Sequence, residues 1–486
     1  MRPRDGRAGK YRFGENYFMN ANRLIYPGFW FGKTDKKDAL KLARRGVGGF
    51  CIYGGTRETV KELVRELREN SPLPHLFICA DYEDGLGRWM SGEAWVLSNL
   101  AVGASTSADT AYQKGLTLAR EARTVGADWV FAPVLDLCDE PQNPIVNTRS
   151  FGADPHLVAR LGAALCKGLS DGGVLNSIKH FPGHGRTSQD SHLGLPVLPR
   201  TLKDLQENEL VPFAATLPYA DSVMIGHLLL PSLDEQRPAS LSRKIITNLL
   251  KGKMKFNGLV LTDALCMKAI GDEQQAALNA LRAGAHILLA AEDSVALSDF
   301  LEKNPPADEI IAASEKLQDT LVQKLNCTPK EGLSPQAFNA RYAPECAVWT
   351  GEKVRLEHNQ TAAYLELGNN ESFAAQDFLN TLKTAGIHLV KAGEKADVLL
   401  AVSFSNYKAF KGHINLSSEE QAILENAAKQ HKKSVFISFG SPFGAEKISA
   451  LTTSLFLFSP AREAQTCAAQ ILLGRQTARG KTPVQL

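Results

Sequence analysis

The sequence predicts an α/β protein in which a (β/α)8 barrel of the TIM type is followed by an α/β sandwich domain. Short apolar runs alternate with helical patterns through the first 300 residues, as in β/α units built around parallel strands. A chain of 486 residues is also long enough for two domains when one of them is a barrel. Eight such runs suggest that the parallel strands close into a ring.

The eight apolar runs define the strands that we expect in the barrel. They occupy residues 24–31, 48–53, 76–80, 129–135, 173–178, 222–226, 258–262 and 285–290. A helical stretch at 307–325 precedes a connector with Pro and Gly at 328–344. We therefore place the barrel domain at residues 1–327 and the second domain at 345–486.

The second domain repeats the α/β alternation. Its strand-like runs occupy residues 363–367, 397–403, 434–439 and 454–458. One of its helices is expected to begin at the capping box that runs from Ser417 to Glu420. The domain has no evident functional motif, so we assign it a role in support or oligomerisation.

Composition excludes several kinds of partner. The formal net charge is +3 with mixed signs along the chain, so we expect neither nucleic acid nor a membrane surface as a partner. The basic start is not followed by an apolar segment typical of a secretory signal, and we find no transmembrane run. Eight scattered cysteines without C-x-x-C spacing predict reduced thiols in a cytoplasmic protein.

Polar residues follow five of the predicted strands. They are Asp81, Asp136, the Lys179-His180 pair, His227 and Asp263. In a barrel these positions share the C-terminal rim, where active sites are built. A single carboxylate such as Asp136 could instead cap a helix, but five positions at one rim favour a site.

The segment from Lys179 to His192 contains three histidines and is rich in Gly, Pro and Ser, which predicts a functional loop. Asp190 and His192 are two residues apart, so an extended chain projects them to one side, where the carboxylate can orient the imidazole. A zinc site at His180, His184, Asp190 and His192 is an alternative, although the spacing of compact zinc sites is missing. A purely structural loop is the other alternative.

Asp263 lies at a predicted strand-to-helix turn on the same rim. A carboxylate there can attack a sugar carbon and form a covalent glycosyl-enzyme, whereas the alternative is a helix cap. Such a reaction also needs a group that gives and then takes a proton, and a histidine such as His192 can do both. We therefore expect no metal and no cofactor.

The motifs KHFPGHGRTSQDSHLGLP, MIGHLLLP and LTDALCMKAI resemble the β-N-acetylglucosaminidase branch of glycoside hydrolase family 3. The segments FAPVLDL, NTRSFGADP and ARGKTPVQL are similar to that family as well, so the resemblance covers nearly the whole chain. It implies that Asp263 is the nucleophile, His192 the general acid/base and Asp190 its dyad partner.

The same resemblance implies a sugar-binding set. Asp81, Arg149, Lys179 and His180 would bind the hydroxyls of the non-reducing sugar, and their side chains are directional partners for hydroxyl groups. His227 and Met267 would wall the pocket, although Met267 could equally belong to the core. A small carbohydrate is the expected partner.

Three positions depart from the family pattern. Arg88 is a further candidate for binding the sugar, although the family's sugar-binding arginine falls one place later. Arg186 replaces a usual acidic residue, and His286 replaces a common Asp. Arg186 could alter loop motion or the preference for the leaving group, whereas His286 is expected to be structural.

The resemblance implies a retaining enzyme that releases terminal β-N-acetylglucosamine from muropeptides or related oligosaccharides. Two other enzymes fit the same residues, a phosphorylase in which phosphate replaces water and a broader family 3 β-glycosidase. A third alternative is an inactive sugar-binding scaffold. Turnover of a chromogenic β-N-acetylglucosaminide separates the enzymes from the scaffold.

Overall fold

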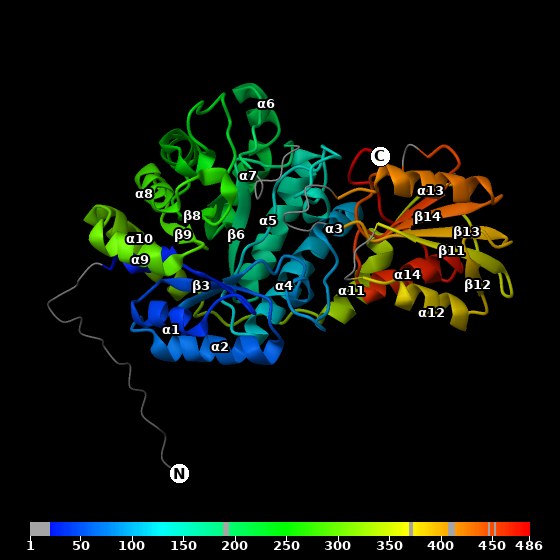
Figure 1. Cartoon of the computed structure of the whole chain (residues 1–486), viewed down its shortest axis with the longest axis horizontal. Helices are drawn as coiled ribbons and strands as arrows, with labels where there is room; N and C mark the ends of the chain where they lie inside the picture. The colour runs from blue at the N-terminus through cyan, green and yellow to red at the C-terminus, as the bar shows by residue number, and fades with distance from the viewer. Residues whose placement is uncertain (1–19, 188–193, 369–372, 407–413, 446–447, 452) are drawn as a thin grey trace, which may run out of the picture.

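The computed structural model describes residues 20–187, 194–368, 373–406, 414–445, 448–451 and 453–486. Two sheets form the molecule, one at each end of its long axis (Figure 1). The predicted dyad residues Asp190 and His192 lie outside the described residues.

The first sheet is a closed parallel barrel. Its first strand is split at Pro27, so that the half before the proline pairs with the last strand and the half after it pairs with the second strand. Proline lacks an N–H group for the ladder, which suits a break between the two halves. The barrel strands are β1 (Ile25–Tyr26), β2 (Gly28–Trp30), β3 (Gly49–Tyr53), β4 (Phe77–Ala80), β5 (Trp129–Val130), β6 (Leu175–Phe181), β7 (Ser222–Ile225), β8 (Leu259–Ala264) and β9 (Ile287–Leu289). All eight predicted barrel strands, and with them the predicted fold class, are confirmed.

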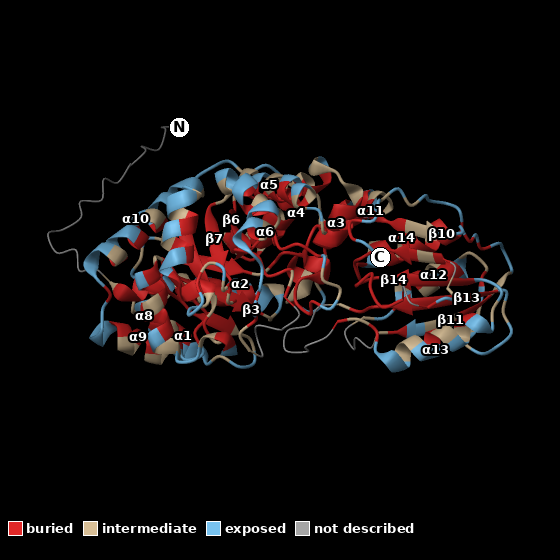
Figure 2. Cartoon of the chain, turned by 90° about the horizontal axis from the view of Figure 1, so that it is seen from above, coloured by how far each residue is buried: buried red, intermediate tan, exposed pale blue. Residues whose placement is uncertain are grey.

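Helices surround the barrel because each carries one apolar face. In the second of them the buried residues are Val60, Leu63, Val64 and Leu67, which recur at helical spacing. Figure 2 shows the buried strands enclosed by helices whose outer faces are exposed. The helices are α1 (Lys36–Arg44), α2 (Arg57–Asn70), α3 (Asn99–Ser105), α4 (Ala108–Thr124), α5 (Pro155–Asp171), α6 (Leu202–Glu207), α7 (Leu210–Thr216), the π-helix η6 (Lys244–Lys253), α8 (Glu273–Ala283), α9 (Ser294–Lys303) and α10 (Asp308–Lys324).

Large side chains fill the barrel interior. Trp129 is fully buried and makes edge contacts with Tyr26, Phe77 and Phe131, at ring-centre distances of 6.1, 5.7 and 5.8 Å. The interior is therefore a packed core, and only its C-terminal end is polar.

The second domain is a six-stranded mixed sheet with helices on both faces (Figure 1). Its first strand is antiparallel to its neighbour and the other strands are parallel. The sequence did not predict β10 or β12. The elements are α11 (Pro335–Cys346), β10 (Val348–Gly351), β11 (Thr361–Leu367), α12 (Gln376–Thr384), β12 (His388–Lys391), β13 (Val398–Ser403), α13 (Ser418–Lys429), β14 (Ser434–Ser438), β15 (Thr453–Phe456) and α14 (Arg462–Leu472).

The two domains are joined by packing as well as by the chain. Helix α11 begins inside the predicted connector and contacts α3 and α4 of the barrel as well as α14 of the second domain. The C-terminal tail returns to the barrel, where the backbone N–H of Ala153 donates to Pro483 O at 3.0 Å. The domain boundaries at 327 and 345 stay a prediction.

The predicted capping box at Ser417 and Glu420 is confirmed. All eight cysteines are free thiols. Within the described residues, no helix combines the length and apolar character that a membrane crossing requires.

Candidate active site

The C-terminal mouth of the barrel brings together the polar residues that follow the strands. Cys79 on β4 and Leu261 on β8 face the interior core. Asp81 directly follows β4 and Asp263 lies near the end of β8, so both residues lie at the C-terminal end of the barrel, beyond that core. Asp263 is half-buried, and its Oδ1 accepts a hydrogen bond from the N–H of Ala264 at 2.8 Å.

Lys179 and Asp81 form an ion pair across this mouth. The distance between Lys179 Nζ and Asp81 Oδ1 is 2.6 Å, and the Lys179 side chain is 1% exposed whereas that of Asp81 is 21% exposed. The pair presents an ammonium and a carboxylate in fixed positions, which suits the binding of a sugar hydroxyl.

His180 is held by Asp136. The distance between His180 Nδ1 and Asp136 Oδ2 is 2.6 Å, and the backbone N–H of His184 donates to Asp136 Oδ1 at 2.6 Å. Burial opposes the charge on Asp136, but His180 and these hydrogen bonds keep the pKa of this carboxyl below its ordinary value. The carboxylate therefore fixes the ring of His180 and the backbone turn that follows it.

Glu83 gathers two of the predicted sugar-binding arginines. Its Oε1 accepts from Arg149 Nε at 2.9 Å and lies 3.4 Å from Arg88 Nη2. Burial disfavours ionisation of Glu83, but the positive charges of Arg149, Lys179 and Arg88 outweigh it and hold the pKa of this carboxyl well below its ordinary value. Sequence reasoning missed Glu83, although it lies only two residues after Asp81.

A second layer supports Arg88. Asp84 Oδ2 accepts from Arg88 Nη1 at 3.0 Å, and Asp84 Oδ1 lies 3.2 Å from Lys114 Nζ. Lys114 is fully buried and also donates to Asn99 Oδ1 at 2.6 Å. Arg88 thus belongs to a buried charge network next to Arg149, and the structure does bring it to the predicted set.

Asn143 ties down the start of the segment that contains Asp190 and His192. Its Nδ2 donates to the backbone oxygens of His184, Gly185 and Thr187, at 3.0, 3.0 and 2.7 Å. Its Oδ1 accepts from two N–H groups of its own loop. This buried amide was not singled out from the sequence, because an asparagine in a loop is normally exposed.

Comparisons with known proteins identify the family of the chain. The model of the glycosyl hydrolase family 3 N-terminal domain matches residues 21–320, which is more than half of the chain. The chain belongs to glycoside hydrolase family 3. It is a family 3 hydrolase, as the resemblance predicted.

The relatives carry related names. A beta-hexosaminidase from Idiomarina loihiensis is 31% identical over 284 residues, which are 56% of this chain and 85% of the relative. The structure of a family 3 beta-N-acetylglucosaminidase from Paenibacillus sp. str. FPU-7 is 25% identical, with a TM-score of 0.83 over 97% of this chain and 99% of that one. A beta-glucoside phosphorylase, 21% identical with a TM-score of 0.85, covers 96% of this chain and 93% of its own and shares the fold.

His227 and Met267, which were expected to wall the pocket, are both buried near the end of β8 in this family 3 site. His227 is fully buried, with Nδ1 2.6 Å from Ser240 Oγ and Nε2 3.1 Å from the backbone oxygen of Ala264. It therefore braces the end of β8 beside Asp263. Met267 is 5% exposed and follows the same strand.

The second domain reaches the family 3 site through one chain of hydrogen bonds. Asn147 Nδ2 donates to Ser441 Oγ at 3.0 Å, and Ser441 Oγ donates to Asn415 Oδ1 at 2.7 Å. Asn415 Nδ2 in turn donates to the backbone oxygen of Pro141 at 2.7 Å. Asn147 begins the turn that carries Arg149, so the second domain contacts the loop that presents this arginine.

The other two residues that depart from the family pattern, Arg186 and His286, lie in different parts of the barrel domain. Arg186 forms ion pairs with Asp139 and, at 3.4 Å, with Glu209 Oε1, next to the segment that holds Asp190 and His192. His286 precedes β9 at the other end of the barrel and does not meet the site. The prediction that His286 is structural stays open at this point.

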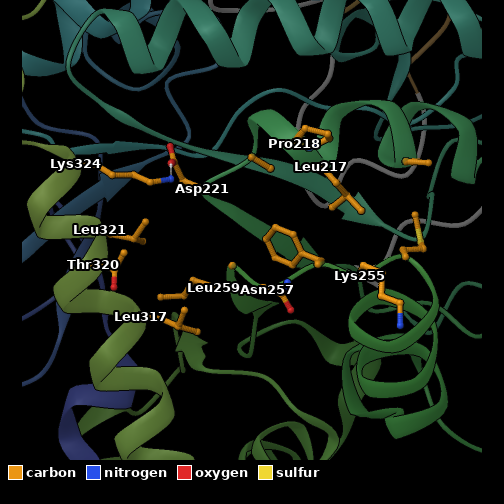
Figure 3. A pocket seen from close by; sticks show the side chains of 15 residues that line it. Leu217, Pro218, Asp221, Lys255, Asn257, Leu259, Leu317, Thr320, Leu321 and Lys324 are labelled. Carbon is orange, nitrogen blue, oxygen red and sulfur yellow. Dashed lines mark hydrogen bonds and ion pairs between the residues drawn. The ribbon is translucent and has the colours of Figure 1, made fainter.

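A cavity of about 420 Å³ lies at the N-terminal end of the barrel (Figure 3). Leu217, Leu259 and Leu317 line it, and Lys324 reaches Asp221 at 2.6 Å beside them. This end of a barrel serves stability, so the cavity is separate from the candidate active site. No group of three or more His, Cys, Asp or Glu side chains within the described ranges is arranged to hold a metal ion.

Proposed function

We propose that the protein is a retaining exo-β-N-acetylglucosaminidase. The observation that carries the proposal is the half-buried carboxylate of Asp263 at a mouth lined by the Lys179–Asp81 and Arg149–Glu83 pairs. Such pairs bind the hydroxyls of one terminal sugar, and the carboxylate can then reach its anomeric carbon. The names of the relatives and of the Paenibacillus structure support N-acetylglucosamine as that sugar.

In the first step Asp263 attacks the anomeric carbon. The new carbon–oxygen bond forms as the bond to the leaving oxygen breaks, and His192 donates a proton to that oxygen. Lys179, Asp81, Arg149 and His180 hold the sugar during the attack, which is where orientation contributes to the rate.

In the second step water replaces Asp263. Neutral His192 removes a proton from water, the water oxygen bonds to the anomeric carbon, and the Asp263 carboxylate leaves. Asp190 stabilises the imidazolium formed in this step and fixes the tautomer of the ring. The cycle uses side chains alone.

The natural substrate and the compartment belong to the proposal as well. The resemblance supports muropeptides or chitooligosaccharides as substrates, with the enzyme acting in the cytoplasm during recycling of the cell wall. The scattered spacing of the eight cysteines in the sequence supports a reducing compartment.

A panel of chromogenic β-glycosides tests the proposed activity. The purified protein would be assayed on the N-acetylglucosaminide, the glucoside and the xyloside, in phosphate and in a phosphate-free buffer. We expect the N-acetylglucosaminide to be turned over at least about tenfold faster than the others, because one matched polar group is worth a factor of this order or more. The product in both buffers should be free N-acetylglucosamine.

Other outcomes identify the alternatives. A sugar 1-phosphate formed in phosphate would indicate a phosphorylase, and faster turnover of the glucoside would indicate a broader β-glycosidase. Binding of N-acetylglucosamine without turnover of any glycoside would indicate an inactive scaffold.

A further inference from the structure

Lys251 lies in an unusual setting at the N-terminal end of the barrel, away from Asp263. It is half-buried near the end of the π-helix η6, and Figure 1 shows the adjoining α8 and β9. Its Nζ is 2.9 Å from His286 Nε2 and 2.5 Å from the backbone oxygen of Gly284. π-Helices are rare and are often found at functional sites, so this position invites a chemical explanation.

The hydrogen bonds of His286 determine where its ring carries a proton. The backbone N–H of Val260 donates to His286 Nδ1 at 2.9 Å, and the N–H of His286 donates to Val260 O at 2.7 Å. A backbone N–H can only donate, so Nδ1 is an acceptor and the proton of the neutral ring lies on Nε2.

This tautomer determines which protonation state of Lys251 fits the contact between the two side chains. His286 Nε2–H points at Lys251 Nζ, and an ammonium group has no lone pair to accept it. A neutral amine accepts that hydrogen and still donates to Gly284 O. All three contacts are satisfied when Lys251 and His286 are both uncharged, a state that Lys251 reaches above its lowered pKa.

The surroundings lower the pKa of both side chains. Burial lowers the pKa of Lys251 to about 8. Burial, followed by the charge of Lys251, lowers the pKa of His286 to about 3. Among the described residues, no carboxylate forms an ion pair with Lys251, and Ser314 on α10 faces His286 with a hydroxyl that donates to its backbone oxygen.

We propose that Lys251 is a modification site at which carbon dioxide adds to Nζ and forms a carbamate. The Nζ lone pair forms a bond to the carbon, one carbon–oxygen π pair moves onto oxygen, and Nζ releases a proton to water. The product retains one N–H group for Gly284 O, and its carboxylate can accept the Nε2–H of His286. The site therefore offers one acceptor and one donor that match the product.

Trapping with isotopic bicarbonate tests this assignment. The full-length protein is equilibrated with ¹³C-bicarbonate near pH 8, treated with a trialkyloxonium salt to esterify carbamates, and mapped by peptide mass spectrometry. The ¹³C ester is expected at Lys251, at least about tenfold above the exposed Lys253 on the same helix. His286→Asp places a carboxylate beside the amine, which favours the ammonium and should abolish the label.

Competition labelling with acetic anhydride over a range of pH gives a second readout that needs no variant. Lys251 of the wild-type protein should acquire its reactivity near pH 8, about two units below an ordinary lysine. The proposal is overturned if Lys251 titrates as an ordinary lysine, if the ester does not exceed that at Lys253, or if His286→Asp carries the label undiminished.

Discussion

At the scale of single residues, buried carboxylates hold the polar side chains of the site in position. Asp136 holds the ring of His180 at 2.6 Å, and Glu83 holds Arg149 at 2.9 Å. Each carboxylate is 1% exposed, so its charge is stabilised by the cationic and N–H groups around it rather than by water. Removing either one would leave buried donor groups with one acceptor fewer.

His184 is expected to make the protein less stable in mild acid. Burial lowers the pKa of His184 to about 4, whereas an unfolded histidine titrates near 6.5. Between these values the unfolded chain binds more protons, so stability present above pH 6.5 is lost as the pH falls towards 4. The loss from this group approaches about 3 kcal/mol.

Denaturant unfolding at several pH values between 7 and 4.5 measures this effect. The free energy of unfolding of His184→Gln should fall less steeply with pH than that of the wild-type protein, whatever its value at pH 7. Equal slopes for the two proteins would show that His184 is not held neutral.

His192→Ala tests the proposed acid/base residue. Its loss should slow natural disaccharides by about a hundredfold or more, because their leaving groups need a proton. Substrates that release an activated phenol should form the glycosyl-enzyme almost as fast as before, and Asp190→Asn should lie between wild type and His192→Ala. Equal slowing of both substrate types would reduce His192 to a binding residue.

At the scale of elements, the amide of Asn143 is one of the groups that tie the loop between β5 and α5 to the loop after β6, together with Asp136 and Asp139. Asn143 donates to three backbone oxygens of the second loop and accepts from two N–H groups of the first. The Asn143 side chain therefore supports both the turn that presents Arg149 and the segment that precedes His192.

Asn143→Asp should therefore lower both stability and activity. It replaces the amide donor with an oxygen that faces three carbonyl oxygens, which costs about 3 kcal/mol or more in the free energy of unfolding. We expect kcat/KM to fall by about tenfold or more, because the two loops lose their relative position. The exposed loop residue Asn257 offers a chemically matched control, and Asn257→Asp should change the free energy of unfolding by less than about 0.5 kcal/mol.

The sequence predicted the regular elements better than the contacts between them. Apolar runs predicted all eight barrel strands because parallel strands are buried on both faces. The sequence analysis missed β12, whose four residues are exposed or only partly buried. Glu83, Lys114 and Asn143 were missed for the opposite reason, because polar residues are normally exposed and only tertiary packing buries them.

At the scale of the whole molecule, the second domain is part of the support for the candidate site. Ser441 links Asn147 of the barrel to Asn415 of its own domain. The C-terminal tail makes a further contact at Ala153. These contacts are consistent with the supporting role expected from the sequence. The part of the barrel that the second domain supports includes the turn that carries Arg149.

Ser441→Ala tests this link between the domains. We expect KM for a β-N-acetylglucosaminide to rise by about threefold to tenfold with a smaller change in kcat, because one hydrogen bond of about 1 kcal/mol that positions Arg149 is lost. Ser405→Ala removes a buried hydroxyl that pairs with Ser403 inside the second domain, and it should leave KM unchanged. Equal effects of the two variants would show that the change reflects general loosening of the domain.

The covalent intermediate on Asp263 is the central claim, and trapping it is the most direct test. The enzyme is incubated with a fluorinated N-acetylglucosaminide that forms the glycosyl-enzyme faster than water removes it, then digested and mapped by mass spectrometry. The account predicts one sugar label, on Asp263, and its loss in Asp263→Ala together with about three or more decades of rate. A label on Asp81 or Asp136, or turnover without any trapped enzyme, would contradict it.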